Sequence, residues 1–359
     1  MKHISSCIYA EIPELINQGI SVVLATVVHT IGSTPQKAGS SAIIGMSGLI
    51  SGTVGGGQTE FKVTEQARIL LQTRKSGLYT YELRGEITEG SESVCGGSMT
   101  ILIDATPEIH LPVFQLMKEQ TEQRRKGVLL TLADSADTND VRLIRQWMES
   151  NDLKTDLSAK IKPVVSQMLH DTHAKSVQTI PFDGIDALSK GFTLAEKILP
   201  KPMLIIAGAG HIGRALAQLG NFLGFSVAVW DDRPEYADPQ KLEAADWVVS
   251  GSLDRLLEKF PIRSDCYLVI VTRGHKTDGE VLRQVIKSDA AYIGMMGSKA
   301  KVAKMKAEFL SKGWATSSRW NCIHTPVGLD IGGQTVEEIA LSIAAELVKV
   351  RNQILVSNE

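Results

Sequence analysis

The chain has 359 residues, of which 43% are hydrophobic and 22% are charged, and its formal net charge is -2. This length predicts two domains, and the small net charge argues against a general nucleic-acid or anionic-membrane binder. No apolar run reaches the roughly 20 residues that a membrane-spanning helix needs. The N-terminal segment also lacks the apolar core of a signal peptide.

The cysteines are widely spaced and form no C-x-x-C pair: they are Cys7, Cys95, Cys266 and Cys322. Neither a structural zinc site nor a disulfide framework is therefore expected. Together with the missing signal peptide, this pattern predicts a protein of the reducing cytoplasm.

The first half of the chain combines helix and strand patterns, and we expect an α+β domain over residues 1–199. Helical periodicity is present at residues 8–19, 58–74 and 111–125. Strand patterns occupy residues 21–31, 40–46, 49–54, 77–83, 98–105 and 128–132. The variable segment that follows predicts helical patches at 141–149 and 157–169 and a strand at 192–198. A proline linker near Pro200 marks the domain boundary.

Two glycine-rich segments of this half are candidates for ligand binding. Gly55, Gly56 and Gly57 precede a helix, so their N–H groups could curl around an anion such as a phosphate. A tight turn without a ligand explains the same pattern. Cys95 ends a polar loop and is followed by Gly96 and Gly97; it is either a ligand or a small buried hydrophobe.

The second half opens with a strand, a glycine turn and a helix. Gly208, Gly210 and Gly213 form the G-x-G-x-x-G pattern of dinucleotide-binding units. The first glycine permits the tight turn, the second lets the backbone approach a pyrophosphate, and the third lets the helix pack on the strand. The helix begins at His211 and directs unpaired N–H groups toward the phosphates.

A second strand follows this helix and ends in two carboxylates, Asp231 and Asp232. Asp231 is placed to accept hydrogen bonds from an adenosine ribose. The complete order of strand, glycine turn, helix, strand and acid predicts a Rossmann-type unit with a bound dinucleotide. A related nucleotide and an empty scaffold remain alternatives.

The alternation of strands and helices continues to the C-terminus. Strands are expected at residues 247–249, 267–272, 291–295 and 320–323, and the last helix begins with a capping box, Thr335 and Glu338. Residues 200–359 are therefore predicted to form a parallel α/β sheet covered on both faces.

Polar loops follow several of these strands, where ligands bind in such sheets. His275 and Asp278 follow the fourth strand and are candidates for proton transfer to a bound ligand. A histidine that caps a helix or meets solvent is the alternative. Lys299 and Lys301 could contact phosphate or could form a solvated face.

Several motifs, taken in order, resemble those of the xanthine dehydrogenase accessory factor family, XdhC/CoxI. The segments in the first half are VLATVVHTIGSTPQKAG, GTVGGGQTE and SVCGGSMTILID. Those in the second half are LIIAGAGHIGRALAQLGNFLGFSVAVWDDRPEYA, YLVIVTRGHKTDGEVL, YIGMMGSKAKV and HTPVGLDIGGQTVEEIALSIAAEL. The resemblance covers residues 20–105 and 200–350 and is loose between them.

The resemblance implies an assembly factor for a xanthine dehydrogenase-type molybdenum hydroxylase of purine catabolism. Such a factor binds molybdenum cofactor of the molybdopterin type and supports its sulfuration together with a cysteine desulfurase. It then inserts the cofactor into the client enzyme. We therefore expect a cofactor chaperone more than a catalyst, acting as a homodimer. The alternative is an NAD(P)-dependent oxidoreductase that uses the Rossmann domain and His275.

The resemblance also changes the interpretation of the glycine-rich segments. Cys95 becomes a candidate molybdenum contact, since a thiolate is a suitable soft ligand. The Gly55–Gly57 turn becomes part of the same site. Gln58 stands where many family members carry a cysteine, which departs from a two-cysteine site. The Rossmann glycines could bind the nucleotide half of a dinucleotide molybdopterin as well as NAD(P), as one wall of a delivery site.

Overall fold

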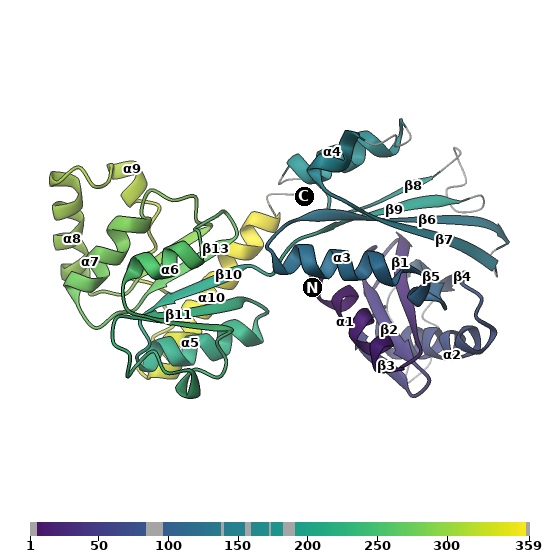
Figure 1. Ribbon diagram of the computed structural model, residues 1–359, viewed down its shortest axis with the longest axis horizontal. Helices are drawn as coiled ribbons and strands as arrows, with labels where there is room; N and C mark the ends of the chain where they lie inside the picture. Colours follow the sequence, from purple (N-terminus) through teal and green to yellow (C-terminus); the bar gives the residue numbers. More distant parts are fainter. Residues whose placement is uncertain are drawn as a thin grey trace. The chain divides into compact units, whose positions relative to one another are not determined.

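The computed structural model describes residues 6–83, 96–137, 140–154, 159–171, 174–181 and 191–356. The chain divides into two compact units between Pro200 and Lys201 (Figure 1). The N-terminal unit contains antiparallel sheets and the C-terminal unit one parallel sheet. The expected fold class, an α+β domain followed by a Rossmann-like domain, is confirmed.

The first sheet of the N-terminal unit has the order β3-β2-β1-β5-β4 and is antiparallel. Its strands are β1 (Val22–Ile31), β2 (Ser41–Gly45), β3 (Gly48–Gly52), β4 (Gly77–Glu82) and β5 (Ser98–Asp104). Helices α1 (Ser6–Asn17) and α2 (Gly57–Thr73) belong to the same segment of the chain. The second antiparallel sheet has the order β7-β6-β9-β8. Its strands are β6 (Gly127–Asp137), β7 (Asp140–Met148), β8 (Val177–Pro181) and β9 (Phe192–Ile198).

The two sheets pack on each other through apolar side chains. Helix α2 covers the outer face of the first sheet with Val63, Ala67 and Leu70. Helices α1 and α3 (Leu111–Glu122) contribute to the core between the sheets, and α4 (Ile161–His170) covers the far face of the second sheet (Figure 1). Two short 3-10 turns, Pro107–His110 and Ser150–Lys154, complete the unit.

The helix predicted at residues 141–149 is wrong, because this segment is strand β7. Its odd-numbered positions Val141, Arg145 and Trp147 are buried, as expected for a strand. Arg145 points inward because it forms an ion pair with the buried carboxylate of Asp104. A charged residue on the buried face concealed the alternation, and the remaining apolar residues resembled a helical pattern. Strand β8 was not predicted.

A buried carboxyl group joins the two sheets to helix α1. Glu196 on β9 is 1% exposed and accepts hydrogen bonds from the Tyr9 hydroxyl, at 2.9 and 3.0 Å from its two oxygens. The same hydroxyl lies 3.1 Å from Ser41 Oγ, which donates to Thr26 Oγ1. Burial raises the pKa of Glu196 to about 7, although the hydrogen bond from Tyr9 lowers it.

Replacement of Glu196 by glutamine is expected to remove a pH-dependent contribution to folding. The pKa of the folded carboxyl is about 7, above the ordinary value of 4.5. Stability from the protonated form is therefore full below the ordinary pKa and is lost as pH rises through about 7. At about 1.4 kcal/mol per pKa unit, the loss is on the order of 3 kcal/mol.

Chemical denaturation of both proteins between about pH 5 and about pH 8 measures this effect. The wild type should lose unfolding free energy relative to Glu196→Gln as pH rises. A difference between the two proteins that is constant across this range would contradict the prediction.

The C-terminal unit contains a parallel sheet of order β12-β11-β10-β13-β14. Its strands are β10 (Met203–Ala207), β11 (Ser226–Asp231), β12 (Trp247–Ser250), β13 (Cys266–Ile270) and β14 (Tyr292–Met295). Its helices are α5 (His211–Phe222), α6 (Leu253–Lys259), α7 (His275–Val285), α8 (Lys299–Ser311), α9 (Ser317–Trp320) and α10 (Val336–Val356). A 3-10 turn spans Pro239–Lys241.

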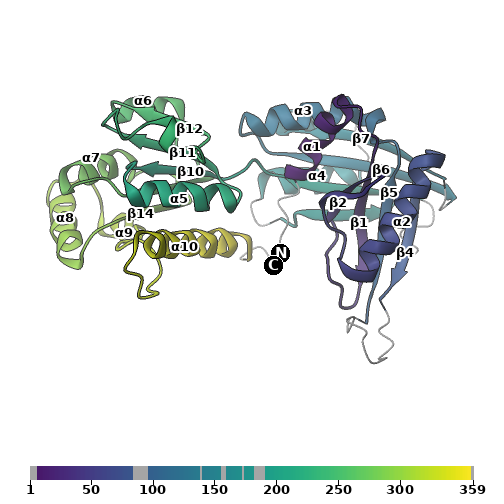
Figure 2. The same cartoon turned by 90° about the horizontal axis from the view of Figure 1, so that it is seen from below.

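Helices cover both faces of this sheet. Helices α5 and α10 contact each other and pack on one face, while α6, α7 and α8 pack on the other (Figure 2). After β10, the chain adds β11 and β12 on one side of this strand. It then crosses over and adds β13 and β14 on the other side. The switch point therefore lies between β10 and β13, where ligands bind in sheets of this type.

Two predictions for the C-terminal part of the chain had different outcomes. The capping box is confirmed, since Glu338 N donates to Thr335 Oγ1 and Thr335 N donates to Glu338 Oε2. The strand predicted at residues 320–323 is wrong, because Trp320 ends helix α9, and the next residue along that pairs with the sheet is His324, which forms an isolated bridge with Gly294. The buried Trp320 and Ile323 contribute to the hydrophobic core on which α8 packs, without strand pairing.

Within the described ranges, no helix combines the length and apolar character that crossing a membrane requires.

Candidate functional site

The glycine turn after β10 is fixed by two close backbone approaches. Gly208 has φ 123°, and a methyl group added to it would lie 2.4 Å from the Val271 carbonyl oxygen. A methyl group on Gly213 would lie 1.9 Å from the Gly208 carbonyl oxygen. Both glycines are therefore required by the packing of the turn and of helix α5 on the sheet.

Gly210 differs from these two glycines because it borders open space. Apart from Gly210 and the two residues that flank it, no atom lies within 4 Å of a methyl group added there, and Gly210 is the N-cap of α5 with an extended backbone. His211 is the first residue of the helix. The start of α5 thus presents its N–H groups at the switch point, as an anion-binding turn requires.

Asp231 holds this turn against the end of β11. Its Oδ2 accepts a hydrogen bond from Ala209 N at 2.9 Å, and the carboxylate is 2% exposed. Arg233 donates from its backbone N and from Nε to Oδ1, and from Nη2 to Oδ2, at 2.9 to 3.1 Å. Burial alone would raise the pKa of Asp231, but these hydrogen bonds outweigh it and lower the pKa.

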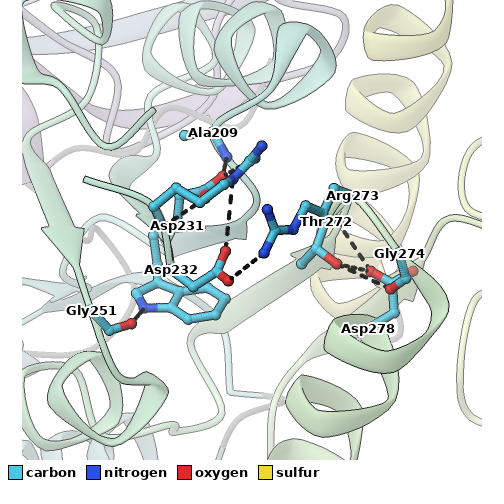
Figure 3. A network of polar contacts seen from close by, with 10 residues as sticks. Ala209, Asp231, Asp232, Gly251, Thr272, Arg273, Gly274 and Asp278 are labelled. Carbon is cyan, nitrogen blue, oxygen red and sulfur yellow. Dashed lines mark hydrogen bonds and ion pairs between the residues drawn. The ribbon is translucent and has the colours of Figure 1, made fainter. Parts of the chain in front are cut away.

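Asp232 is the carboxylate at this strand end that faces solvent. Its side chain is 38% exposed and accepts a hydrogen bond from Arg273 Nη2 at 3.2 Å. Arg273 follows β13 and extends across to Asp232 (Figure 3). The sequence interpretation noted Asp232 but assigned no role to it or to Arg273. An Asp-Asp-Arg run after the second strand is the signal that could have drawn attention to this position.

The two candidates for proton transfer, His275 and Asp278, have different environments. Asp278 is 1% exposed, and its Oδ1 accepts hydrogen bonds from Thr272 N and Thr272 Oγ1 (Figure 3). Its Oδ2 forms an ion pair with Lys301 on α8. His275 is the first residue of α7 and is half-buried. Asp278 therefore joins the loop after β13 to the first turn of α8.

The two lysines considered for phosphate binding have different environments. Lys301 contacts Asp278 and also donates to the Met296 carbonyl oxygen at 3.3 Å. Lys299 is exposed and, together with Lys306 and Trp320, lines a groove of about 510 Å³ between α8 and the segment after α9. The lining of this groove does not include residues of the glycine turn.

The loop that precedes α10 is held by one carboxylate. Glu346 accepts hydrogen bonds from the Tyr292 hydroxyl at 2.5 Å and from Gly328 N at 2.8 Å. His324 Nδ1 lies 3.1 Å from the other oxygen of Glu346. Burial favours a higher pKa for Glu346, but the hydrogen bonds from His324, Tyr292 and Gly328 lower it. The HTPVG segment is therefore attached to α10 and to β14.

The N-terminal unit brings its glycine-rich segments together. A methyl group on Gly55 would lie 3.2 Å from Pro35 Cγ, and one on Gly97 would lie 2.6 Å from the Ser33 carbonyl oxygen. A methyl group on Gly32 would lie 3.1 Å from the Gly96 carbonyl oxygen. The loop at residues 32–35 therefore contacts both the triple-glycine turn and the two glycines that follow Cys95.

The triple-glycine turn leads directly into α2. Gly56 and Gly57 have φ values of 67° and 53°, and no atom lies within 4 Å of a methyl group on either. Cys95, the candidate molybdenum contact, lies outside the described residues. Among the residues that are described, no group of three or more His, Cys, Asp and Glu side chains is arranged to hold a metal ion.

Comparison with known proteins places both units in one family. Residues 204–347 match the family described as the XdhC Rossmann domain, and residues 15–82 match the XdhC and CoxI family. The chain belongs to the XdhC/CoxI family. The two matched segments contain the glycine turn at Gly208–Gly213 and the turn at Gly55–Gly57.

Similar proteins extend this match over nearly the whole chain. A Bacillus subtilis (strain 168) protein that is named as a probable xanthine dehydrogenase subunit is 27% identical over 336 residues, which are 93% of this chain and 94% of that protein. "Uncharacterized protein YqeB" of Escherichia coli (strain K12) is 25% identical over 346 residues, which are 96% of this chain but 46% of that protein. A crystal structure of a xanthine dehydrogenase from Bacillus halodurans has a TM-score of 0.73, with 23% identity and 96% coverage of both chains. The structural similarity concerns the fold.

Two alanine substitutions separate the packing role of the turn from its open side. Gly213→Ala places a methyl group 1.9 Å from a carbonyl oxygen and is expected to lower the free energy of unfolding by about 3 kcal/mol. Gly210→Ala adds a methyl group in open space, at a backbone conformation that alanine adopts. This variant should change the free energy of unfolding by less than about 1 kcal/mol. Thermal and urea denaturation measure both changes. Equal stability losses in the two variants would contradict this assignment.

The contacts of Asp278 predict a loss of stability when its charge is removed. Asp278→Asn leaves the Lys301 ammonium without its carboxylate and is expected to cost about 2 kcal/mol. Lys299→Met, which changes an exposed lysine on the same helix, serves as the control and should leave stability nearly unchanged. Urea denaturation of both variants is the measurement. A fully stable Asp278→Asn protein would show that the ion pair does not stabilise the contact of α7 with α8.

Proposed function

We propose that the chain is an accessory factor that binds molybdenum cofactor, supports its sulfuration and inserts it into a xanthine dehydrogenase-type hydroxylase. One observation carries the proposal. Both units match one family, and a relative named for xanthine dehydrogenase aligns with 93% of this chain and 94% of its own length. A function that requires both units together fits this end-to-end correspondence.

The geometry of the two glycine turns supports a phosphate-bearing ligand. The start of α5 has open space beside Gly210, where an anion can meet helix N–H groups. The start of α2 has open space beside Gly56 and Gly57. Molybdopterin carries a phosphate, and its dinucleotide form also carries a nucleotide. The open space beside a glycine turn in each unit thus supports the proposal of a phosphate-bearing cargo.

Cys95 is proposed to contact the molybdenum through its sulfur. The glycines that follow it, Gly96 and Gly97, contact the 32–35 loop, which also touches the triple-glycine turn. Soft thiolate ligands suit a transition metal, and a single one allows the cargo to be released. A cysteine desulfurase as sulfur donor and a homodimer as the working form belong to the same proposal.

The rival function, an NAD(P)-dependent oxidoreductase, finds less support in the site. Its proton-transfer pair would be His275 and Asp278. The Asp278 carboxylate is buried and occupied by Thr272 and Lys301, so it does not orient His275 in the contacts described. A general acid or base must reach its substrate within hydrogen-bond distance. This arrangement favours a carrier that holds a ligand over an enzyme that relays a proton.

A paired substitution tests the proposal for the cofactor. Purified wild type is titrated with isolated molybdenum cofactor, and bound molybdenum is measured after rapid gel filtration. Cys95→Ala is expected to weaken binding at least about tenfold, which corresponds to about 1.4 kcal/mol. Cys322→Ala removes an exposed thiol elsewhere and should bind as the wild type does.

The outcomes separate the parts of the proposal. No binding of molybdenum cofactor by the wild type would refute the carrier function. Equal binding by wild type and Cys95→Ala would refute the role of Cys95 alone. Hydride transfer from NADH or NADPH to a small substrate, at rates typical of enzymes, would establish the rival function. Activation of an apo-hydroxylase by the loaded wild type is the positive result for delivery.

A further inference from the structure

The solvent-exposed ion pair between Asp232 and Arg273 lies at the carboxyl edge of the parallel sheet. Asp232 follows β11 and Arg273 follows β13, the two strands that flank β10. Their side chains are 38% and 57% exposed, and Arg273 Nη2 lies 3.2 Å from Asp232 Oδ2. The pair thus joins the two sides of the switch point (Figure 3).

We infer that Asp232 and Arg273 together recognise a nucleoside diphosphate with free ribose hydroxyls, which replaces their ion pair when it binds. The inference rests on the part of the proposed function that places a nucleotide at the Rossmann glycine turn. It assigns the ribose contact to Asp232 and the diphosphate contact to Arg273. In the absence of the ligand, Asp232 and Arg273 pair with each other and occupy each other's binding groups.

Asp231 cannot take the ribose without losing existing contacts. Its carboxylate is 2% exposed and already accepts four hydrogen bonds, one from Ala209 and three from Arg233. Removal of these donors would release the glycine turn that the ligand needs. Asp232, the next residue, has the same chemistry and faces solvent. A carboxylate accepts hydrogen bonds from vicinal hydroxyls, which is the contact expected at the end of the second strand.

Arg273 has the position and chemistry for a phosphate contact. It follows β13 on the side of the switch point where the Gly208 turn approaches Val271. A guanidinium presents a planar set of donors that suits phosphate oxygens. An exposed ion pair is weak and screened by salt, so exchange of its partner for a dianionic group is favourable. The charges of the two side chains are thus complementary to the ligand's two ends.

The same residues predict exclusion of a 2′-phosphate. Asp232 places an exposed carboxylate at the proposed ribose position, beside the buried carboxylate of Asp231. The guanidinium of Arg233 is engaged with Asp231, its Nε lies 3.8 Å from Asp232 Oδ1, and its Cζ lies 3.6 Å from the Tyr236 ring centroid. Two carboxylates therefore already neutralise the single Arg233 guanidinium, and a phosphate on the ribose would meet the carboxylate of Asp232.

Isothermal titration with ADP, CDP and GDP tests the inference on the full chain. The tightest of the three probes is then titrated into the variants. Asp232→Asn and Arg273→Gln are each expected to weaken its binding at least about tenfold. Both variants should keep the wild-type melting temperature, because the ion pair is exposed. Asp231→Asn serves as the matched control and should lower the melting temperature, since its carboxylate is buried and bonded to the turn.

A charge exchange distinguishes recognition from a purely structural link. The double variant Asp232→Arg/Arg273→Asp keeps an ion pair but places a carboxylate at the diphosphate position, so it should lose binding. Retained binding in this variant would overturn the inference. Tighter binding by Arg273→Gln would also overturn it, since the ion pair would then only obstruct the crevice.

Two further outcomes bear on the ligand. The 2′-phosphorylated form of the chosen probe should bind at least about tenfold more weakly than the probe itself, and equal binding would contradict the assignment of Asp232. Failure of all three nucleoside diphosphates to bind the wild type would overturn the inference. The proposed carrier function is judged separately by the binding of molybdenum cofactor to the same protein.

Discussion

The buried carboxylate of Asp231 holds together the elements of the nucleotide-type unit. It binds the Ala209 N–H, which belongs to the glycine turn after β10, and the Arg233 side chain, which belongs to the loop after β11. This glycine turn positions the start of α5 at the switch point. Without this carboxylate, an isolated N–H would face the interior, and the two loops would lose their shared partner.

The parts of the fold that follow local rules could be predicted from sequence. Gly213 packs on the carbonyl oxygen of Gly208, which is close in the sequence, so the local glycine pattern identified the turn and the Rossmann unit, whereas the approach of Gly208 to Val271 is long-range. Strand β7 was not recognised, because Arg145 occupies a buried position through an ion pair with Asp104, which is distant in the sequence. The strand prediction at residues 320–323 was wrong for a related reason. Its apolar residues serve helix packing on α8, a contact that no local pattern records.

In the candidate site as well, long-range contacts decide the positions of side chains, and the sequence could not predict them. The sequence indicates two acids after β11, but which of them faces solvent depends on Arg233 and on the turn at Ala209. In the N-terminal unit, the sequence identifies each glycine-rich segment separately. The contact of the 32–35 loop with both segments is a long-range feature and required the structure.

The pairing of charged groups bears on what kind of protein this is. Asp231 is paired with Arg233, Asp278 with Lys301, and Glu346 with His324. A catalyst of proton or hydride transfer needs a group that is poised to react with its substrate. These pairs instead fix loops at the carboxyl edge of the sheet. Asp232 and Arg273 are paired as well, but both are substantially exposed, so their pair can open at small cost. Rigid loops beside an exposed ion pair at this edge are consistent with the capture and release of a ligand that we propose for the chain.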